Sequence, residues 1–126
     1  MSGAKKPTKY RSVTIQRMTE IGTYRPQFEA TICDYADLCM QYDMLMERFK
    51  ESGYEMTEEY TNKAGATNIR KTATYLALET IRKEKLNHES ILGLTPAGLK
   101  KINEIEMKGK KKMDKLSEAL NNLGQT

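Results

Sequence analysis

The chain has 126 residues, with 21 lysines and arginines against 17 acidic residues, and a formal net charge of +4. This length suits one domain with at most a short additional segment. No apolar run approaches the roughly 18 residues that a membrane-spanning helix needs, and no apolar stretch follows the basic start as it does in a secretion signal. We therefore expect neither membrane association nor secretion.

The charge is divided into three blocks along the chain. Residues 1–27 carry six basic groups and one acidic group, residues 28–60 carry two and nine, and residues 61–126 carry thirteen and seven. An acidic middle is thus flanked by two basic regions. Basic regions attract polyanions such as nucleic acid, and an acidic region can pair with the basic region of a neighbouring copy.

The start of the chain predicts a basic flexible arm over residues 1–11, because lysines surround Pro7, and then a short helix over Ser12–Ile21. Four glycines each follow a stretch of helical character, as is typical of residues that end helices in the left-handed conformation. These glycines are Gly22, Gly53, Gly93 and Gly124.

A long helix is predicted from Pro26 to Ser52, because apolar residues recur there at alternating spacings of three and four. This heptad stripe is wide enough to serve both the core of one chain and an interface between copies. Its residues are Phe28, Ile32, Tyr35, Leu38, Cys39, Tyr42, Leu45, Met46 and Phe49. A long core helix of a monomer is the simpler alternative.

The residues from Tyr54 to Asn68 predict an extended loop or a small hairpin, because turn-forming residues interrupt the helical pattern. A third helix is expected over Arg70–Leu92. The sequence Leu92-Gly93-Leu94-Thr95-Pro96 then predicts a sharp corner, since Gly93 ends one helix and Thr95 caps the next. The fourth helix is strongly basic, and Gly109 is expected to bend or fray it.

The last apolar residues resume a helical spacing beyond Gly109 and predict an amphipathic docking segment or part of an oligomer seam. They are Met113, Leu116, Leu120 and Leu123. We therefore expect an all-α fold of four helices, with a helical oligomerisation and DNA-binding domain over residues 12–107. A Lys-rich amphipathic segment follows over residues 108–126.

The sequence predicts no enzyme, no metal site and no cofactor. It has no Gly-rich phosphate loop, and its single histidine, His88, stands on a predicted helix beside Glu89 without a nucleophile in a triad-like pattern. Cys33 and Cys39 lie six residues apart in one helix, on different faces, which indicates two reduced thiols.

Basic residues can neutralise DNA phosphates without reading bases, and the basic patches lack the interleaved aromatics of single-strand binders, so duplex DNA is the expected ligand. The candidate DNA-binding residues are Lys5, Lys6, Lys9, Arg11, Arg70, Lys71, Arg82, Lys83, Lys100, Lys101, Lys108, Lys110, Lys111 and Lys112.

Four segments between residues 12 and 105 resemble the small terminase subunits of tailed bacteriophages. They are Gly22-Thr23-Tyr24-Arg25-Pro26, the turn-rich stretch from Thr61 to Asn68, Tyr75-Leu76-Ala77-Leu78, and Leu92-Gly93-Leu94-Thr95-Pro96-Ala97-Gly98-Leu99. The last of these is the most specific, and the Lys-rich tail carries no matching motif.

The resemblance implies a helical protein that forms a ring homo-oligomer in the host bacterial cytoplasm. It implies binding to double-stranded viral DNA at the start of genome packaging and delivery of that DNA to the large terminase subunit, whose ATPase and nuclease activity the small subunit modulates. Residues 113–123 are the expected docking segment for that large subunit.

Two other readings of the sequence remain open. A dimeric helix-turn-helix transcriptional regulator would place Ala97, Lys100, Lys101 and Glu104 in a major groove. A structural coiled-coil protein with an incidental basic tail would bind DNA only at low salt.

Overall fold

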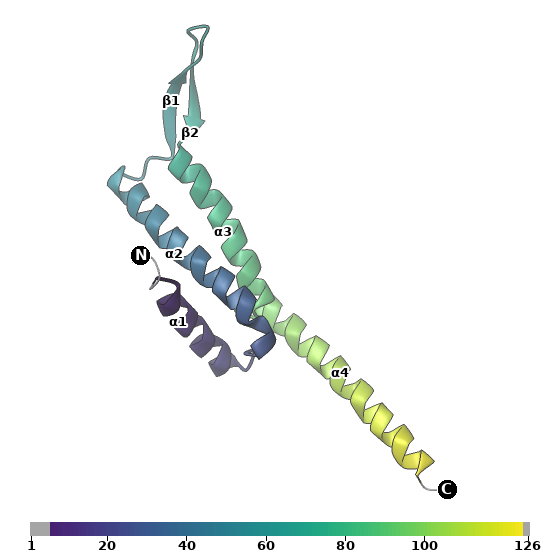
Figure 1. The fold of residues 1–126 in the computed structure, drawn as a ribbon. Helices are drawn as coiled ribbons and strands as arrows, with labels where there is room; N and C mark the ends of the chain where they lie inside the picture. The colour runs from purple at the N-terminus through teal and green to yellow at the C-terminus, as the bar shows by residue number, and fades with distance from the viewer. Residues whose placement is uncertain (1–5, 125–126) are drawn as a thin grey trace.

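The computed structural model describes residues 6–124, with side chains from Lys9 onward, and is mostly helical. The elements in chain order are α1 (Lys6–Ile21), the short 3-10 turn η2 (Pro26–Phe28), α2 (Glu29–Glu51), β1 (Thr57–Thr61), β2 (Thr67–Lys71), α3 (Ala73–Ile91) and α4 (Pro96–Leu123). Figure 1 shows α2 and α3 as a long helical hairpin, with α1 beside part of α2 and α4 leading away. The predicted mainly helical fold is confirmed.

A two-stranded antiparallel hairpin joins α2 to α3 and stands at the far end of that helical pair (Figure 1). Thr57 pairs with Lys71 and Thr61 with Thr67, and Asn62 closes the turn by accepting the amide protons of Ala64 and Ala66 on its side-chain oxygen. The sequence predicted either an extended loop or a small hairpin for this segment, and the structure shows a hairpin.

Three predicted helix starts are wrong. α2 begins at Glu29 rather than Pro26, since Pro26–Phe28 form the 3-10 turn η2. α1 begins at Lys6 rather than Ser12, so residues 6–11 are helical and not part of a flexible arm, while Lys5 and the side chain of Lys6 lie outside the described part of the chain. α3 begins at Ala73 rather than Arg70, because Arg70 and Lys71 complete β2. The Thr72 hydroxyl then caps α3 by accepting the amide proton of Tyr75 at 3.2 Å.

Two predictions about glycines are also wrong. α4 runs without a break through Gly109, because an exposed glycine costs a helix only about 1 kcal/mol relative to alanine. Gly124 follows α4 with φ −78°, a right-handed conformation, whereas Gly22, Gly53 and Gly93 have positive φ as expected.

The core lies between α1, α2 and the end of α3. Its central side chains are Met18, Ile32, Tyr35 and Leu92, all buried. Of the α2 stripe, Ile32, Tyr35, Leu38 and Phe49 are buried, while Phe28, Cys39, Tyr42, Leu45 and Met46 are partly buried. The stripe therefore packs largely within its own chain, with each buried aliphatic or aromatic side chain contributing about 1.5–3 kcal/mol.

The corner between α3 and α4 depends on two glycines. Gly93 adopts φ +75°, and the next amide, of Leu94, donates to the Glu89 carbonyl at 2.8 Å, which closes the end of α3. At Gly98 a Cβ atom would lie 2.0 Å from the backbone carbonyl oxygen of Ser90. The first turn of α4 can pass this close to α3 only without a side chain.

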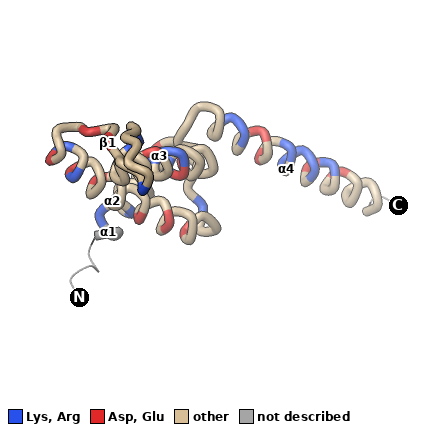
Figure 2. The backbone as a smooth tube through the Cα atoms, turned by 90° about the horizontal axis from the view of Figure 1, so that it is seen from above, with Lys and Arg blue, Asp and Glu red and all other residues tan. Residues whose placement is uncertain are grey.

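Beyond this corner, the contacts between α4 and the rest of the described chain lie at the base of the helix. Leu99 and Ile102 are half-buried, and Arg25 forms an ion pair with Glu106. From Met107 to Leu123 every residue is exposed, and this part of the helix projects from the body of the molecule in both Figure 1 and Figure 2. We call residues 107–123 the α4 extension.

We expect Gly98→Ala to destabilise the fold, because the new methyl group overlaps a backbone carbonyl that cannot turn aside. Overpacking of this kind costs about 1–3 kcal/mol, and thermal unfolding followed by circular dichroism measures it. Gly109→Ala is the matched control, since nothing lies within 4 Å of a Cβ there, and it should instead raise stability slightly. Equal stability of the two variants would contradict the close approach at Gly98.

Candidate nucleic-acid interface

Arg11, a predicted DNA-binding residue, is neutralised within the chain. Its Nη2 atom donates to Oε1 of Glu29 at 2.6 Å, and the Tyr24 hydroxyl donates to the other carboxylate oxygen at 2.6 Å. The hydrogen bonds from Tyr24 and then Arg11 lower the pKa of Glu29. Arg11 therefore ties α1 to α2 and is poorly placed to hold a phosphate.

The two predicted cations of β2 are neutralised in the same way. Arg70 donates to Glu58 on β1 at 2.9 Å and stacks over the Tyr60 ring at 4.2 Å. Lys71 pairs with Glu79 of α3 at 3.0 Å. Both were predicted to open the third helix. Instead, Arg70 joins the two strands of the hairpin and Lys71 joins the hairpin to α3.

The cations near the middle of α3 differ from one another. Arg82 lies against the sulfur of Met46 and over the Tyr42 ring, while Lys83 is exposed. Lys85 forms an ion pair with Glu89 at 3.0 Å and lies over the Tyr35 and Tyr42 rings.

Glu89 joins α2 to α3, because it also accepts the hydroxyl proton of Tyr35. Burial acts to raise the pKa of Glu89, but the hydrogen bonds from Tyr35 and Lys85 outweigh it, and the net shift is downward. Burial raises the pKa of Cys39 beside them, which keeps this thiol protonated and unreactive at neutral pH.

Among the described side chains, the lysines of α4 form the largest group of cations without a partner carboxylate. Among the residues whose side chains are described, Lys100, Lys101, Lys108, Lys110, Lys111, Lys112 and Lys115 are exposed and make no ion pair. Five of them stand on the α4 extension against two carboxylates, and Figure 2 shows the cations following this helix outward. Lys115 was not among the predicted contacts, although its spacing from Lys111 places it with them.

Two sides of the α4 extension are distinct. Lys108, Lys111 and Lys115 are separated by three and four residues and so share one face, which we call the basic stripe. Met113, Leu116 and Leu120 have the same spacing and form an apolar stripe about 140° around the helix from the first. These three apolar side chains, and Leu123 after them, are more than half exposed.

The corner residues of the helix-turn-helix reading lie at the base of α4. Ala97, Lys100, Lys101 and Glu104 are exposed, but the first turn of the helix is held against Ser90 through the buried Gly98. A recognition helix uses its first turns to read bases. One face of this turn is therefore occupied by its contact with α3, and only the outer face would be free to enter a groove.

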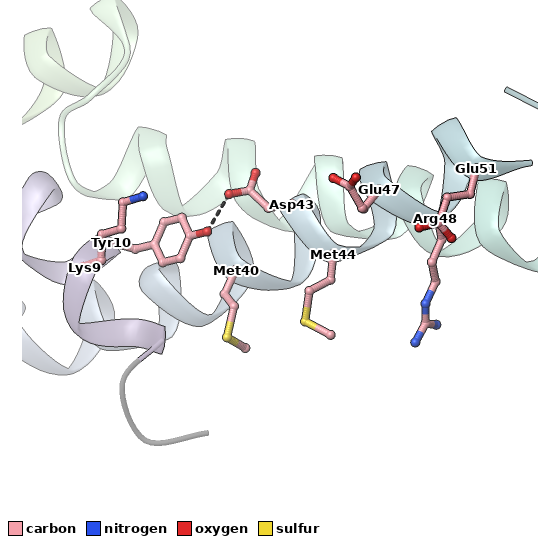
Figure 3. Close-up of a pocket in the computed structure, with 8 residues that line it drawn as sticks. All are labelled: Lys9, Tyr10, Met40, Asp43, Met44, Glu47, Arg48 and Glu51. Carbon is pink, nitrogen blue, oxygen red and sulfur yellow. Dashed lines mark hydrogen bonds between the residues drawn. The ribbon is translucent and has the colours of Figure 1, made fainter. Parts of the chain in front are cut away.

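A groove that the sequence did not reveal runs along the second half of α2, past the N-terminal end of α1. Its volume is about 670 Å³, and its lining includes Met40, Met44, Asp43, Glu47 and Glu51. In Figure 3 the sulfur ends of Met40 and Met44 point to one side while the carboxylates of Asp43 and Glu47 lie on the other, and the Tyr10 hydroxyl donates to Asp43 at 2.6 Å. We call this the Met40–Met44 groove. Its apolar floor and acidic border suit a basic amphipathic segment.

No metal-binding cluster is found in the part of the chain that the structure describes. No three His, Cys, Asp or Glu side chains gather there as metal ligands would, and His88 lies with Nδ1 2.8 Å from the Glu84 carbonyl of its own helix. Among residues 6–124, none of the helices combines the length and the apolar character that a membrane crossing demands.

Comparison with protein families matches residues 8–109 to the phage terminase small subunit. The chain belongs to that family. The match ends at Gly109, so most of the α4 extension of this small subunit lies beyond it. No curated protein and no solved structure matched the chain.

Glu89→Gln should lower the free energy of unfolding of the small subunit at pH 7 by about 1–2 kcal/mol, because the amide loses the charge that attracts Lys85. The folded pKa of Glu89 is below its ordinary value of 4.5, so this stabilisation is present above pH 4.5 and is lost as the pH falls through the lowered folded value. The stability difference between variant and wild type should therefore shrink in acid. Urea denaturation across pH 3–7 measures it.

Glu104→Gln is the control for that experiment, since Glu104 is exposed and has no ion-pair partner among the described side chains. It should leave the stability and its pH profile unchanged. A difference between Glu89→Gln and wild type that persists undiminished at the acid end would contradict the assigned role of the carboxylate.

Proposed function

We propose that this small subunit is a non-catalytic adaptor of phage genome packaging, which binds double-stranded viral DNA and presents it to the large terminase subunit. Family membership supports the packaging role, and the observation that carries DNA binding is the uncompensated set of lysines on α4. In this proposal the protein works in the host cytoplasm as a ring of identical copies and modulates the ATPase and nuclease activity of the large subunit.

The difference between ion-paired cations and cations without a carboxylate partner supports α4 as the DNA-contacting element. Arg11, Arg70 and Lys71 already hold carboxylates at 2.6–3.0 Å, so a phosphate would have to compete with those partners. The lysines of the α4 extension have no such competitor in the described structure. A row of lysines at helical spacing on a projecting helix can follow a phosphate backbone without reading its sequence.

Lys111→Gln/Lys115→Gln should weaken binding to duplex DNA several-fold. It should also make the slope of log affinity against log salt shallower by about 0.9 for each phosphate that the variant no longer neutralises. Fluorescence anisotropy over a salt series measures both quantities. The pair lies on the basic stripe, away from the apolar stripe, so the substitution leaves the apolar face intact.

Arg70→Gln/Lys71→Gln is the matched control, because it removes the same charge from residues that are ion-paired. Its effect on the salt slope should be much smaller. An equal decrease in affinity in both double variants would show that binding follows net charge alone, and an unchanged slope in the Lys111/Lys115 variant would remove the basic stripe from the interface.

Ring assembly predicts a high-order oligomer at micromolar protein concentration in light scattering. A chain of 14.4 kDa has a limited core, and this one exposes apolar side chains on α2, α3 and α4 that a neighbouring copy could cover. A monomer under those conditions would contradict the ring. The docking of residues 113–123 on the large subunit stays a prediction, and it is an alternative to any contact between copies that covers the same side chains.

A further inference from the structure

The second half of α2 presents an apolar surface that its own chain leaves open. Met44 is 48% exposed and lies between two hollows: the Met40–Met44 groove, and a second hollow of about 450 Å³ lined by Leu45, Ala77 and Ile81 between α2 and α3. α1 covers only the first half of α2 (Figure 1). The open surface therefore continues the line of α1 along the same helix.

The α4 extension also exposes apolar side chains that its own chain does not cover. Met113, Leu116 and Leu120 are 63%, 55% and 60% exposed on a helix that leaves the body of the molecule (Figures 1 and 2). The Met40–Met44 groove lies toward the hairpin end of α2, whereas α4 departs from the opposite end of the helical pair. One copy therefore does not place its own extension in its own groove.

From these two surfaces we infer that the α4 extension of one copy docks in the Met40–Met44 groove of a second copy, so that copies join head to tail. The inference rests on the proposed function, because it specifies a contact by which the ring would assemble. A head-to-tail contact between identical chains closes into a ring when its rotation permits closure.

Charge complementarity identifies a second copy as the occupant. The groove is bordered by Asp43, Glu47 and Glu51, and helix geometry places Lys110 and Lys112 on the two sides of the apolar stripe. Docking would bring one of these two lysines, set by the direction of the docked helix, to the carboxylate side while Met113, Leu116 and Leu120 cover the two methionines. Arg48 and Lys9 also line the groove, so the attraction is strongest toward the carboxylate side.

The length of the apolar stripe also fits within the length of the groove. At 1.5 Å per residue, α2 rises about 16 Å from Met40 to Glu51, and the stripe from Met113 to Leu120 rises about 10 Å. Pairing two extensions with each other is the competing arrangement for the same stripe. It would bring together five lysines from each copy, whereas docking on α2 places a lysine that flanks the stripe near carboxylates.

The test uses two double variants that remove apolar side chains without adding charge. The extension variant is Leu116→Gln/Leu120→Gln, and the groove variant is Met40→Gln/Met44→Gln. Each alone should raise the dissociation constant of the oligomer at least about tenfold in analytical ultracentrifugation of the full chain, because each takes two apolar side chains out of the interface. Circular dichroism confirms that the variants remain folded.

Mixing the two variants gives the decisive readout. The intact extension of the groove variant can still enter the intact groove of the extension variant, but the heterodimer then has no second working contact. The mixture should therefore form a one-to-one heterodimer and nothing larger. Met107→Gln and Leu86→Gln, which alter equally exposed residues outside both surfaces, should assemble as wild type.

Each other outcome overturns the inference in a recognisable way. A groove variant that assembles normally shows that the groove is not used, and that extensions pair with each other or another surface joins the copies. An extension variant that assembles normally frees the stripe for another partner, such as the large subunit. A monomeric wild type contradicts the proposed ring itself, whereas an oligomeric wild type with unaffected variants contradicts only this contact.

Discussion

The close contact between Gly98 and the Ser90 carbonyl fixes the direction in which α4 leaves the rest of the molecule. It brings the first turn of α4 against the last turn of α3, and the Arg25–Glu106 pair then fixes the base of the helix to the α1–α2 connection. Since these anchors all lie within the first three turns, the rest of α4 points away from the core. An amphipathic helix held in this way can bury its apolar stripe only against another molecule.

The same fold decides which cations are available to a polyanion. Arg11, Arg70 and Lys71 are brought to carboxylates from other elements, and they fasten α1 to α2 and the hairpin to α3. The α4 extension meets no such element. Its lysines keep their charge uncompensated because the anchors at Gly98 and Glu106 carry them away from the acidic α2.

Local signals in the sequence predicted the helices, the hairpin segment and the corner at Gly93–Thr95. The failures have physical causes. Pro7 suggested a disordered start, yet a proline in the first turn of a helix has no amide hydrogen bond to lose, and α1 includes it. Arg70 and Lys71 were assigned to a helix because nothing local shows that they pair with β1.

The candidate site was harder to predict than the fold, because ion pairing and burial depend on contacts between distant residues. A count of charges treats Arg11 and Lys111 as equal. In the structure Arg11 is neutralised by Glu29, whereas Lys111 has no ion pair among the described side chains. The strongest apolar pattern, the heptad stripe of α2, proved to be largely core. The open surface beside it contains only two apolar residues one helical turn apart, Met40 and Met44, and so short a pattern does not show whether the side chains are covered.

The proposed contact with DNA and the proposed contact between copies can share one helix, because the two stripes of α4 face in different directions. When the apolar stripe is seated in a neighbouring groove, Lys110 and Lys112 lie at the edges of the contact. Lys108, Lys111 and Lys115 lie about 140° away and remain turned outward. Assembly would then place one basic stripe per copy at regular intervals, and a duplex touching several copies would meet several stripes at once. Affinity gained in this way would depend on the number of copies joined, so the proposed phosphate contact of one chain would be strengthened by assembly.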